Sequence, residues 1–174
     1  MLRLLAVLAL ATAVPAAAQC PAPGLPPDAP GPLRVMNLAA HPDDEDGLTL
    51  AYYRGHRDAL ATSIIFTRGE GGQNEIGPDL YERLGAVRTR ETEAAARVLG
   101  TQVIYLNHYD FGFSKHAREA FAEWSLPQTG FWEPRRAEGR VEVGREAVTA
   151  GLVYLYRKHK PDVVFTNHDT VTVG

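Results

Sequence analysis

Residues 33–47 read LRVMNLAAHPDDEDG, and this stretch determines how the rest of the chain is interpreted. Its first half, VMNLAA at 35–40, is mostly apolar and lacks Gly and Pro, which is typical of a buried parallel strand. The chain then passes directly into one imidazole, at His41, and four carboxylates that end at Asp46. Open α/β sheets bind their ligands at the carboxyl ends of the strands. We therefore expect a functional site in this loop.

The residue types in the loop suit a metal site. An imidazole nitrogen from His41 and a carboxylate oxygen from Asp44 are both good ligands for a divalent ion such as zinc. Pro42 stiffens the turn, so these two side chains could face one point while Asp43 lies beside it as a base for metal-activated water. The alternative is a solvated acidic loop that caps the next helix, with His41 as a bystander. For an isolated His-x-x-Asp pair, that alternative is favoured.

The whole string AHPDDE after an apolar strand resembles the PIG-L/LmbE-like de-N-acetylases, a family of metal-dependent deacetylases. The resemblance implies that His41 and Asp44 bind Zn²⁺ and that Asp43 is the general base. It also implies hydrolysis of the acetamide of an N-acetylglucosamine-type sugar or conjugate, a small-molecule substrate. Further features of the chain, described below, match the same family.

Composition indicates one ordinary globular domain. The chain has 174 residues, of which 45% are hydrophobic and 22% charged, and its formal net charge is −3. Such a chain is long enough for a proper core and is not typical of a disordered protein. The sequence shows no basic stripe, so nothing indicates nucleic-acid binding. No particular protein partner is indicated.

The N-terminus is typical of a signal peptide, predicted at 1–18. Arg3 precedes an apolar run, Leu4–Val14, and Ala16–Ala18 offers a small-residue cleavage site. The run is short for a membrane span, so we expect export to the periplasm or medium without stable membrane insertion. The alternative is a buried N-terminal helix.

Residues 19–32 are rich in Pro, Gly and Ala and are predicted to form an extended tether. They include Cys20, the single cysteine, which allows no internal disulfide. Lipid attachment at Cys20 is disfavoured because Gln19 is bulky where lipoprotein signals carry a small residue. The deacetylase-like domain is then predicted at 33–174.

Strand and helix patterns alternate along this domain. Apolar β-branched runs predict strands, and apolar residues at helical spacing predict helices. The order predicts a Rossmann-like, doubly wound α/β fold with a mainly parallel sheet, helices on both faces and a site at the strand carboxyl ends. Residues 115–140 are the least regular part, and their aromatics are expected to form a satellite core rather than a rim for sugar rings. Beyond the strand at 35–40, the expected elements are helices at 47–58, 80–99 and 142–159 and strands at 59–67, 103–106 and 162–166.

Several further side chains are site candidates. The glycine-rich loop at 68–75 follows the second strand, and its glycines suit a loop that folds over a pocket. Its TRGE and Asn74 resemble family segments, so Arg68, Glu70 and Asn74 are expected to line the pocket and hold sugar hydroxyls. Arg88 lies in an R-x-x-E pattern that resembles the family's helix beside the site, so it is a candidate for contacting the substrate. The alternative is a surface ion pair. Asp110 follows the third strand, as an aspartate near the active site does in the family, and is expected to bind substrate. His108 remains ambiguous there.

One departure from the family pattern concerns the third metal ligand. In the family this ligand comes from an H-x-x-H segment after the strand that here ends at Thr166, and no such segment appears before Gly174. Because catalytic zinc usually has three protein ligands, His168 is a possible substitute. We expect a fragment of a longer protein, or else a degenerate relative that binds carbohydrate without turnover. A different hydrolase such as an esterase is a third hypothesis.

Overall fold

The computed structural model describes residues 31–72, 74–112, 117–125 and 141–168. The predicted signal peptide and nearly all of the predicted tether lie outside these residues. No helix among the described residues is long and apolar enough to cross a membrane. The described residues belong to one compact unit, Gly31–Gly174.

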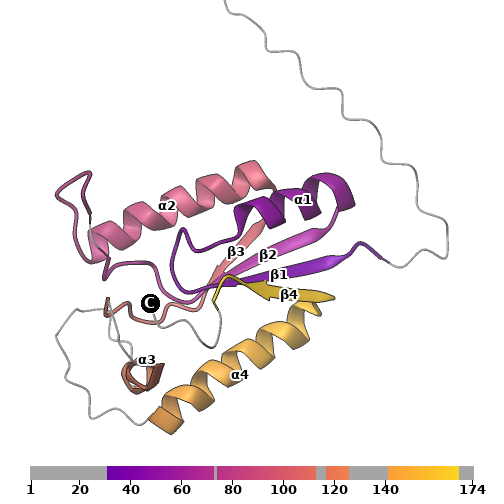
Figure 1. Ribbon diagram of the computed structural model, residues 1–174. Coiled ribbons are helices and arrows are strands. Elements are labelled where there is room, and N and C mark those ends of the chain that lie inside the picture. Colours follow the sequence, from indigo (N-terminus) through magenta and orange to yellow (C-terminus); the bar gives the residue numbers. More distant parts are fainter. Residues whose placement is uncertain (1–30, 73, 113–116, 126–140, 169–174) are drawn as a thin grey trace, which may run out of the picture. The chain divides into compact units, whose positions relative to one another are not determined.

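A four-stranded sheet, ordered β3-β2-β1-β4, forms the centre of this unit (Figure 1). All neighbouring strands are parallel, and Leu38 in β1 pairs with Ile64 on one side and Thr166 on the other. The chain builds outward from β1 to β3 and then returns to place β4 on the free side of β1. The sheet therefore has its topological switch point between β1 and β4, as a doubly wound fold requires. The strands are β1 (Arg34–Ala39), β2 (Leu60–Ile65), β3 (Gln102–Tyr105) and β4 (Val163–Thr166).

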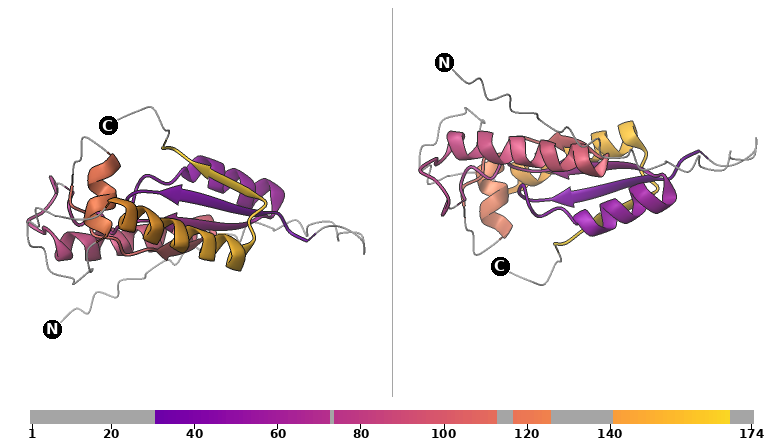
Figure 2. Two further views of the ribbon diagram at one scale, coloured as in Figure 1. Left: turned by 90° about the horizontal axis from the view of Figure 1, so that it is seen from below. Right: turned by 90° about the horizontal axis from the view of Figure 1, so that it is seen from above.

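Helices cover both faces of the sheet, as predicted. The views from below and from above show α4 in front of one face and α1 with α2 in front of the other (Figure 2). The alternation along β1 explains this, since Val35 packs with Leu50 of α1 and Met36 packs with Leu155 of α4. The helices are α1 (Gly47–Arg57), α2 (Glu82–Leu99), α3 (Ala117–Trp124) and α4 (Val141–His159).

Asp46 caps the helix that follows the acidic loop. Its Oδ1 accepts a hydrogen bond from the backbone N–H of Thr49 at 2.9 Å, which satisfies one of the free donors of the first turn of α1. A loop that caps the next helix was the alternative to a metal site, and this alternative is confirmed for Asp46. It does not account for His41 and Asp44, which point elsewhere.

Helix α3 was not among the expected elements, because residues 115–140 were expected to be the least regular part of the chain, and residues 117–124 are helical. Trp124 at its end stacks on the His108 ring, with centroids 4.7 Å apart, and lies 5.6 Å from the Phe66 ring. The expected aromatic satellite core is therefore confirmed for Trp124, whereas Trp132 lies outside the described residues. His108 belongs to this cluster, and burial lowers the pKa of its imidazole. Aromatic packing is thus the role the structure gives His108.

Two glycines of α4 offer a matched stability test. A Cβ at Gly144 would overlap the backbone carbonyl of Phe121 in α3, whereas a Cβ at Gly151 would meet nothing within 4 Å. We expect Gly144→Ala to reduce the free energy of unfolding by about 1–2 kcal/mol, since the two helices must separate. Gly151→Ala should raise it by about 0.5–1 kcal/mol through helix propensity. Urea unfolding of both variants measures the difference, and equal effects would contradict the close approach of α3 and α4.

Candidate functional site

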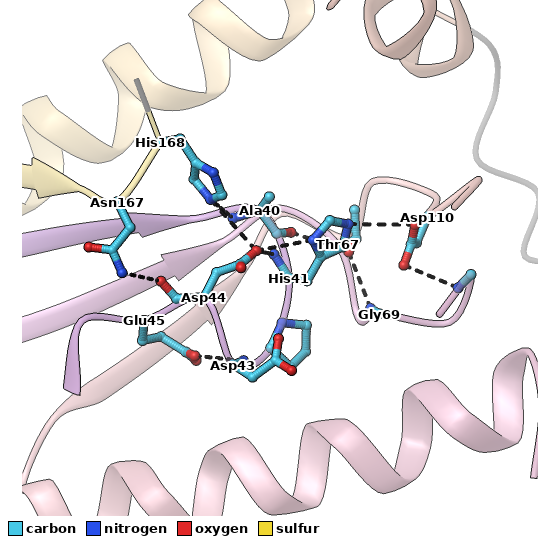
Figure 3. A network of polar contacts seen from close by, with 12 residues as sticks. Ala40, His41, Asp43, Asp44, Glu45, Thr67, Gly69, Asp110, Asn167 and His168 are labelled. Atoms are coloured by element: carbon cyan, nitrogen blue, oxygen red, sulfur yellow. Dashed lines mark hydrogen bonds and ion pairs between the residues drawn. The ribbon is translucent and has the colours of Figure 1, made fainter. Parts of the chain in front are cut away.

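His41 and Asp44 meet in the loop directly after β1 (Figure 3). The backbone N–H of His41 donates to Asp44 Oδ2 at 2.9 Å, and Nδ1 of the same ring lies 3.0 Å from that oxygen. The tight turn also includes a hydrogen bond from the Asp44 N–H to the His41 carbonyl at 3.2 Å. The sequence therefore brings these two side chains together locally, as predicted.

The end of β4 reaches the same carboxylate from across the switch point. His168 Nε2 lies 3.6 Å from Asp44 Oδ2, and it accepts the Ala40 N–H at 3.2 Å. Asn167 donates from Nδ2 to the Asp44 carbonyl at 3.0 Å. The ends of two strands thus bring Asp44, Asn167 and His168 together at this point.

Asp110 contacts the other side of the His41 ring. Its Oδ1 lies 3.6 Å from His41 Nε2, an ion-pair distance that is too long for a hydrogen bond. The side chain of Asp110 is only 4% exposed, so it approaches the ring from the protein interior. Asp110 and then Asp44 raise the pKa of His41 to about 9. His41 in turn lowers the pKa of Asp44.

Whether these residues suit a metal ion can be judged from donor type and spacing. Among the residues that the structure describes, no group of three His, Cys, Asp or Glu side chains stands ready to hold an ion. However, Asp44 Oδ2 lies 3.0 Å from one ring nitrogen, of His41, and 3.6 Å from another, of His168. A tetrahedral zinc ion with bonds of about 2.0–2.1 Å spaces its ligand atoms roughly 3.3 Å apart. The donor set therefore fits zinc in kind and in these two spacings.

Asp43 faces away from this group and toward α2. Its Oδ2 lies 2.8 Å from Nη2 of Arg88, and its side chain is 77% exposed. The backbone of Asp43 has φ 91°, a strained value for a residue other than glycine. Glu45 accepts the Asp43 N–H at 2.8 Å and so helps to hold this conformation. Next to Asp43 and Arg88, a cavity of about 310 Å³ opens between α2 and the sheet.

Arg88 ties the acidic loop to the glycine-rich loop. Its guanidinium donates to the Pro42 carbonyl at 2.6 Å and to the Gly69 carbonyl at 3.2 Å. Gly69 has φ 71°, and a Cβ there would overlap the guanidinium. The alternative of a surface ion pair within the R-x-x-E pattern is therefore wrong for Arg88. Its ion-pair partner is Asp43, and its side chain is only 19% exposed.

Arg68 and Asn74 use their polar groups within the protein. Arg68 donates to Asn107 Oδ1 and Thr89 Oγ1, both at 2.9 Å, and its guanidinium lies over the ring of Tyr105. Asn74 accepts two backbone N–H groups of its own loop through Oδ1, and its Nδ2 donates to the Asp79 carbonyl at 2.9 Å. The structure thus gathers His41, Asp44, Asp110 and His168, and gives Arg68 and Asn74 structural partners.

Sequence reasoning missed one residue that organises the site, Asn167, and assigned another, Glu70, to the sugar pocket instead of to the loop backbone. Glu70 accepts the backbone N–H groups of Arg68 and Asp110 with its two carboxylate oxygens, at 3.0 and 3.2 Å. Asn167 holds the Asp44 carbonyl from the end of β4. Glu70 lies in the TRGE segment, so its position was visible in the sequence. Its contact with Asp110 was not, because Asp110 follows a different strand.

The raised pKa of His41 predicts a pH dependence of the metal-free protein. A group whose pKa is higher in the folded state stabilises the fold below its unfolded value, here 6.5, and loses this contribution as the pH rises through about 9. The side chain is 39% exposed, so solvent screening limits the effect to about 1 kcal/mol. Urea unfolding at pH 6.5 and at about pH 9 should show a smaller free energy of unfolding at the higher pH. His41→Gln should abolish that part of the dependence, and an unchanged dependence would contradict the assignment.

Comparison with known proteins places the chain in a family. Residues 36–172 match the PIG-L family model, described as GlcNAc-PI de-N-acetylase. This match covers well over half of the chain, so the protein belongs to the PIG-L family, and the resemblance read from AHPDDE is confirmed.

Individual relatives are more distant. The 1D-myo-inositol 2-acetamido-2-deoxy-alpha-D-glucopyranoside deacetylase of Mycobacterium leprae, in strains Br4923 and TN, is 29% identical over 143 residues. That alignment covers 76% of this chain and 42% of the relative. The chain therefore spans less than half the length of these relatives.

Two solved structures are also similar. GalB, the 4-carboxy-2-hydroxymuconate hydratase from Pseudomonas putida KT2440, aligns with TM-score 0.51 and 19% identity over 76% of this chain and 45% of its own. N,N'-diacetylchitobiose deacetylase from Pyrococcus horikoshii aligns with TM-score 0.40 and 20% identity over 67% of this chain and 48% of its own. The likeness to GalB supports the fold and says nothing of activity.

Proposed function

We propose that this chain carries part or all of a metal-dependent N-deacetylase that hydrolyses the acetamide of an N-acetylglucosamine-type sugar or conjugate. The observation that carries the proposal is the convergence of His41, Asp44 and His168 at the switch point of the sheet. Family membership supports it, because the matched model is described as a de-N-acetylase. The M. leprae relatives are named as deacetylases of an acetamido-glucopyranoside.

The metal we propose is zinc, held by Nδ1 of His41, by Asp44, and by His168 or a residue outside this chain. Zinc would supply Lewis acidity toward the amide carbonyl and toward the attacking water. To serve as a ligand, His168 must exchange the Ala40 N–H, which its Nε2 now accepts, for the ion.

Asp43 is the proposed general base. Arg88 keeps its carboxylate at the edge of the site, next to the 310 Å³ cavity, and Glu45 holds its strained backbone. To act as the base, the Asp43 side chain must turn from Arg88 toward the His41–Asp44 pair, where its carboxylate would accept a proton from the attacking water. Arg88 is the arginine that we propose to contact a sugar, because it lines the 310 Å³ cavity together with Asp43.

The proposal is tested by acetate release from N-acetylglucosaminyl-inositol and from N,N'-diacetylchitobiose, with and without a zinc chelator. We expect release that the chelator abolishes and that added zinc restores. Sugar binding that is insensitive to the chelator, without acetate release, would instead support the non-catalytic alternative. Faster release from O-acetyl than from N-acetyl sugars would identify an esterase.

A further inference from the structure

We propose that Asp110 is the positioning residue that directs Nδ1 of His41 toward Asp44 and the metal, and that Glu70 fixes Asp110 in place. This inference rests on the proposed function, since it concerns the same site. It adds two residues to that site and assigns the ring nitrogen that binds the ion.

The first argument is the orientation of the imidazole. Nδ1 of His41 lies 3.0 Å from Asp44 Oδ2, while Nε2 lies 3.6 Å from Asp110 Oδ1. Asp110 is buried, whereas the side chains of His41 and Asp44 are 39% and 31% exposed. Nδ1 therefore faces the more exposed carboxylate, that of Asp44, and the interior carboxylate of Asp110 lies on the Nε2 side. Histidine ligands commonly direct their other ring N–H toward a carboxylate, which fixes the ring and strengthens the ligand. Asp110 occupies that position at an ion-pair distance of 3.6 Å.

The second argument is that the Asp110 carboxylate cannot easily turn. Its Oδ1 accepts the Gly112 N–H at 2.9 Å, and its Oδ2 accepts the Gly71 N–H at 3.1 Å. A Cβ at Gly71 would come within 2.5 Å of the Asp110 carbonyl oxygen, so only glycine allows this approach. The carboxylate is thus clamped between the loops that follow β2 and β3.

The third argument is that Glu70 clamps the backbone of Asp110. Glu70 Oε1 accepts the Asp110 N–H at 3.2 Å, and Oε2 accepts the Arg68 N–H at 3.0 Å. One side chain therefore joins the start of the glycine-rich loop to the residue that faces His41. The His41 ring is held at the end of a chain of contacts that runs from Glu70 through Asp110.

The experiment measures zinc affinity in competition with a chromophoric chelator for the wild type, Asp110→Asn and a charge control, Asp46→Asn. Asp46 lies two residues from Asp44, and asparagine is about as good an N-cap as aspartate, so this control removes one nearby charge and keeps the helix. We expect Asp110→Asn to weaken zinc binding by about 10- to 100-fold. Asp46→Asn should change it by no more than about twofold.

A spectroscopic measurement separates positioning from simple bracing of the fold. Ring ¹⁵N spectra of the zinc-bound wild type should show the ion on Nδ1 of His41 and the proton on Nε2. Zinc on Nε2 would overturn the proposal, and so would a wild-type chain that takes up no zinc. Equal losses of zinc affinity in Asp110→Asn and Asp46→Asn would show that only the removal of a nearby negative charge matters. That result would also overturn the proposal.

Glu70→Gln keeps the proposal testable if Asp110→Asn does not fold. Glutamine offers one acceptor oxygen, so one of the two hydrogen bonds from backbone N–H groups is lost. Zinc affinity should then fall several-fold. Unchanged zinc affinity would show that Glu70 does not help to position Asp110. Acetate release distinguishes the two proposals. A chain that binds zinc through Nδ1 in an Asp110-dependent manner but releases no acetate would contradict the proposed function and leave this inference standing.

Discussion

Asp43→Asn is expected to lower kcat for acetate release by at least about a hundredfold while zinc content stays near that of the wild type. General-base catalysis contributes about 10²- to 10⁴-fold, and an amide cannot accept the proton. Asparagine suits the test because it tolerates positive φ better than alanine does, and Asp43 has φ 91°. Metal content should hold because Asp43 contacts Arg88 and not the His41–Asp44 pair.

The measurement is the steady-state rate of acetate release together with elemental analysis of the purified variant. Glu93→Ala serves as the control, since Glu93 is exposed on α2 and alanine suits a helix. Its kcat should match the wild type. Substantial turnover by Asp43→Asn would remove Asp43 from the base role, and loss of zinc would show that Asp43 belongs to the metal site.

The strand ends were predictable because their pattern is local. A strand such as β1 is recognised from a short apolar run, and His41 with Asp44 follows it within one turn. Parallel strands place their carboxyl ends on one edge, so the meeting of this loop with the end of β4 follows from topology. Helix α3 was not predicted. Several prolines and glycines follow it between 126 and 140, and their presence indicated that the whole of 115–140 would lack regular structure. The strain at Asp43 was equally invisible in the sequence.

Side-chain partners within the site were less predictable, because they depend on which loops pack together. The glycine-rich loop at 68–75 was expected to fold over a pocket and to hold sugar hydroxyls. In the structure, Gly69 instead makes room for the Arg88 guanidinium, and Gly71 makes room for Asp110. A glycine-rich sequence shows that something approaches the backbone closely, but it does not show whether a ligand or the protein itself does so.

Gly71→Ala should therefore damage the fold and the site together. The added Cβ would lie 2.5 Å from the Asp110 carbonyl oxygen and 2.6 Å from the Gly112 nitrogen, and neither backbone atom can rotate away. We expect a loss of about 2–3 kcal/mol in the free energy of unfolding, typical of overpacking at a rigid contact. Urea unfolding measures this loss, and zinc affinity should fall as well because Asp110 is displaced from His41.

Gly77→Ala is the matched control in the same loop. Its Cβ would meet only the Asn74 amide nitrogen, at an ordinary contact distance of 3.7 Å, so stability should change by less than about 0.5 kcal/mol. If both variants were equally stable, the loops after β2 and β3 would not pack as closely as the structure shows. If Gly71→Ala were destabilised but bound zinc normally, Asp110 would brace the fold without orienting His41. The pair of variants thus separates the stability of this loop from its proposed part in holding the metal ligand.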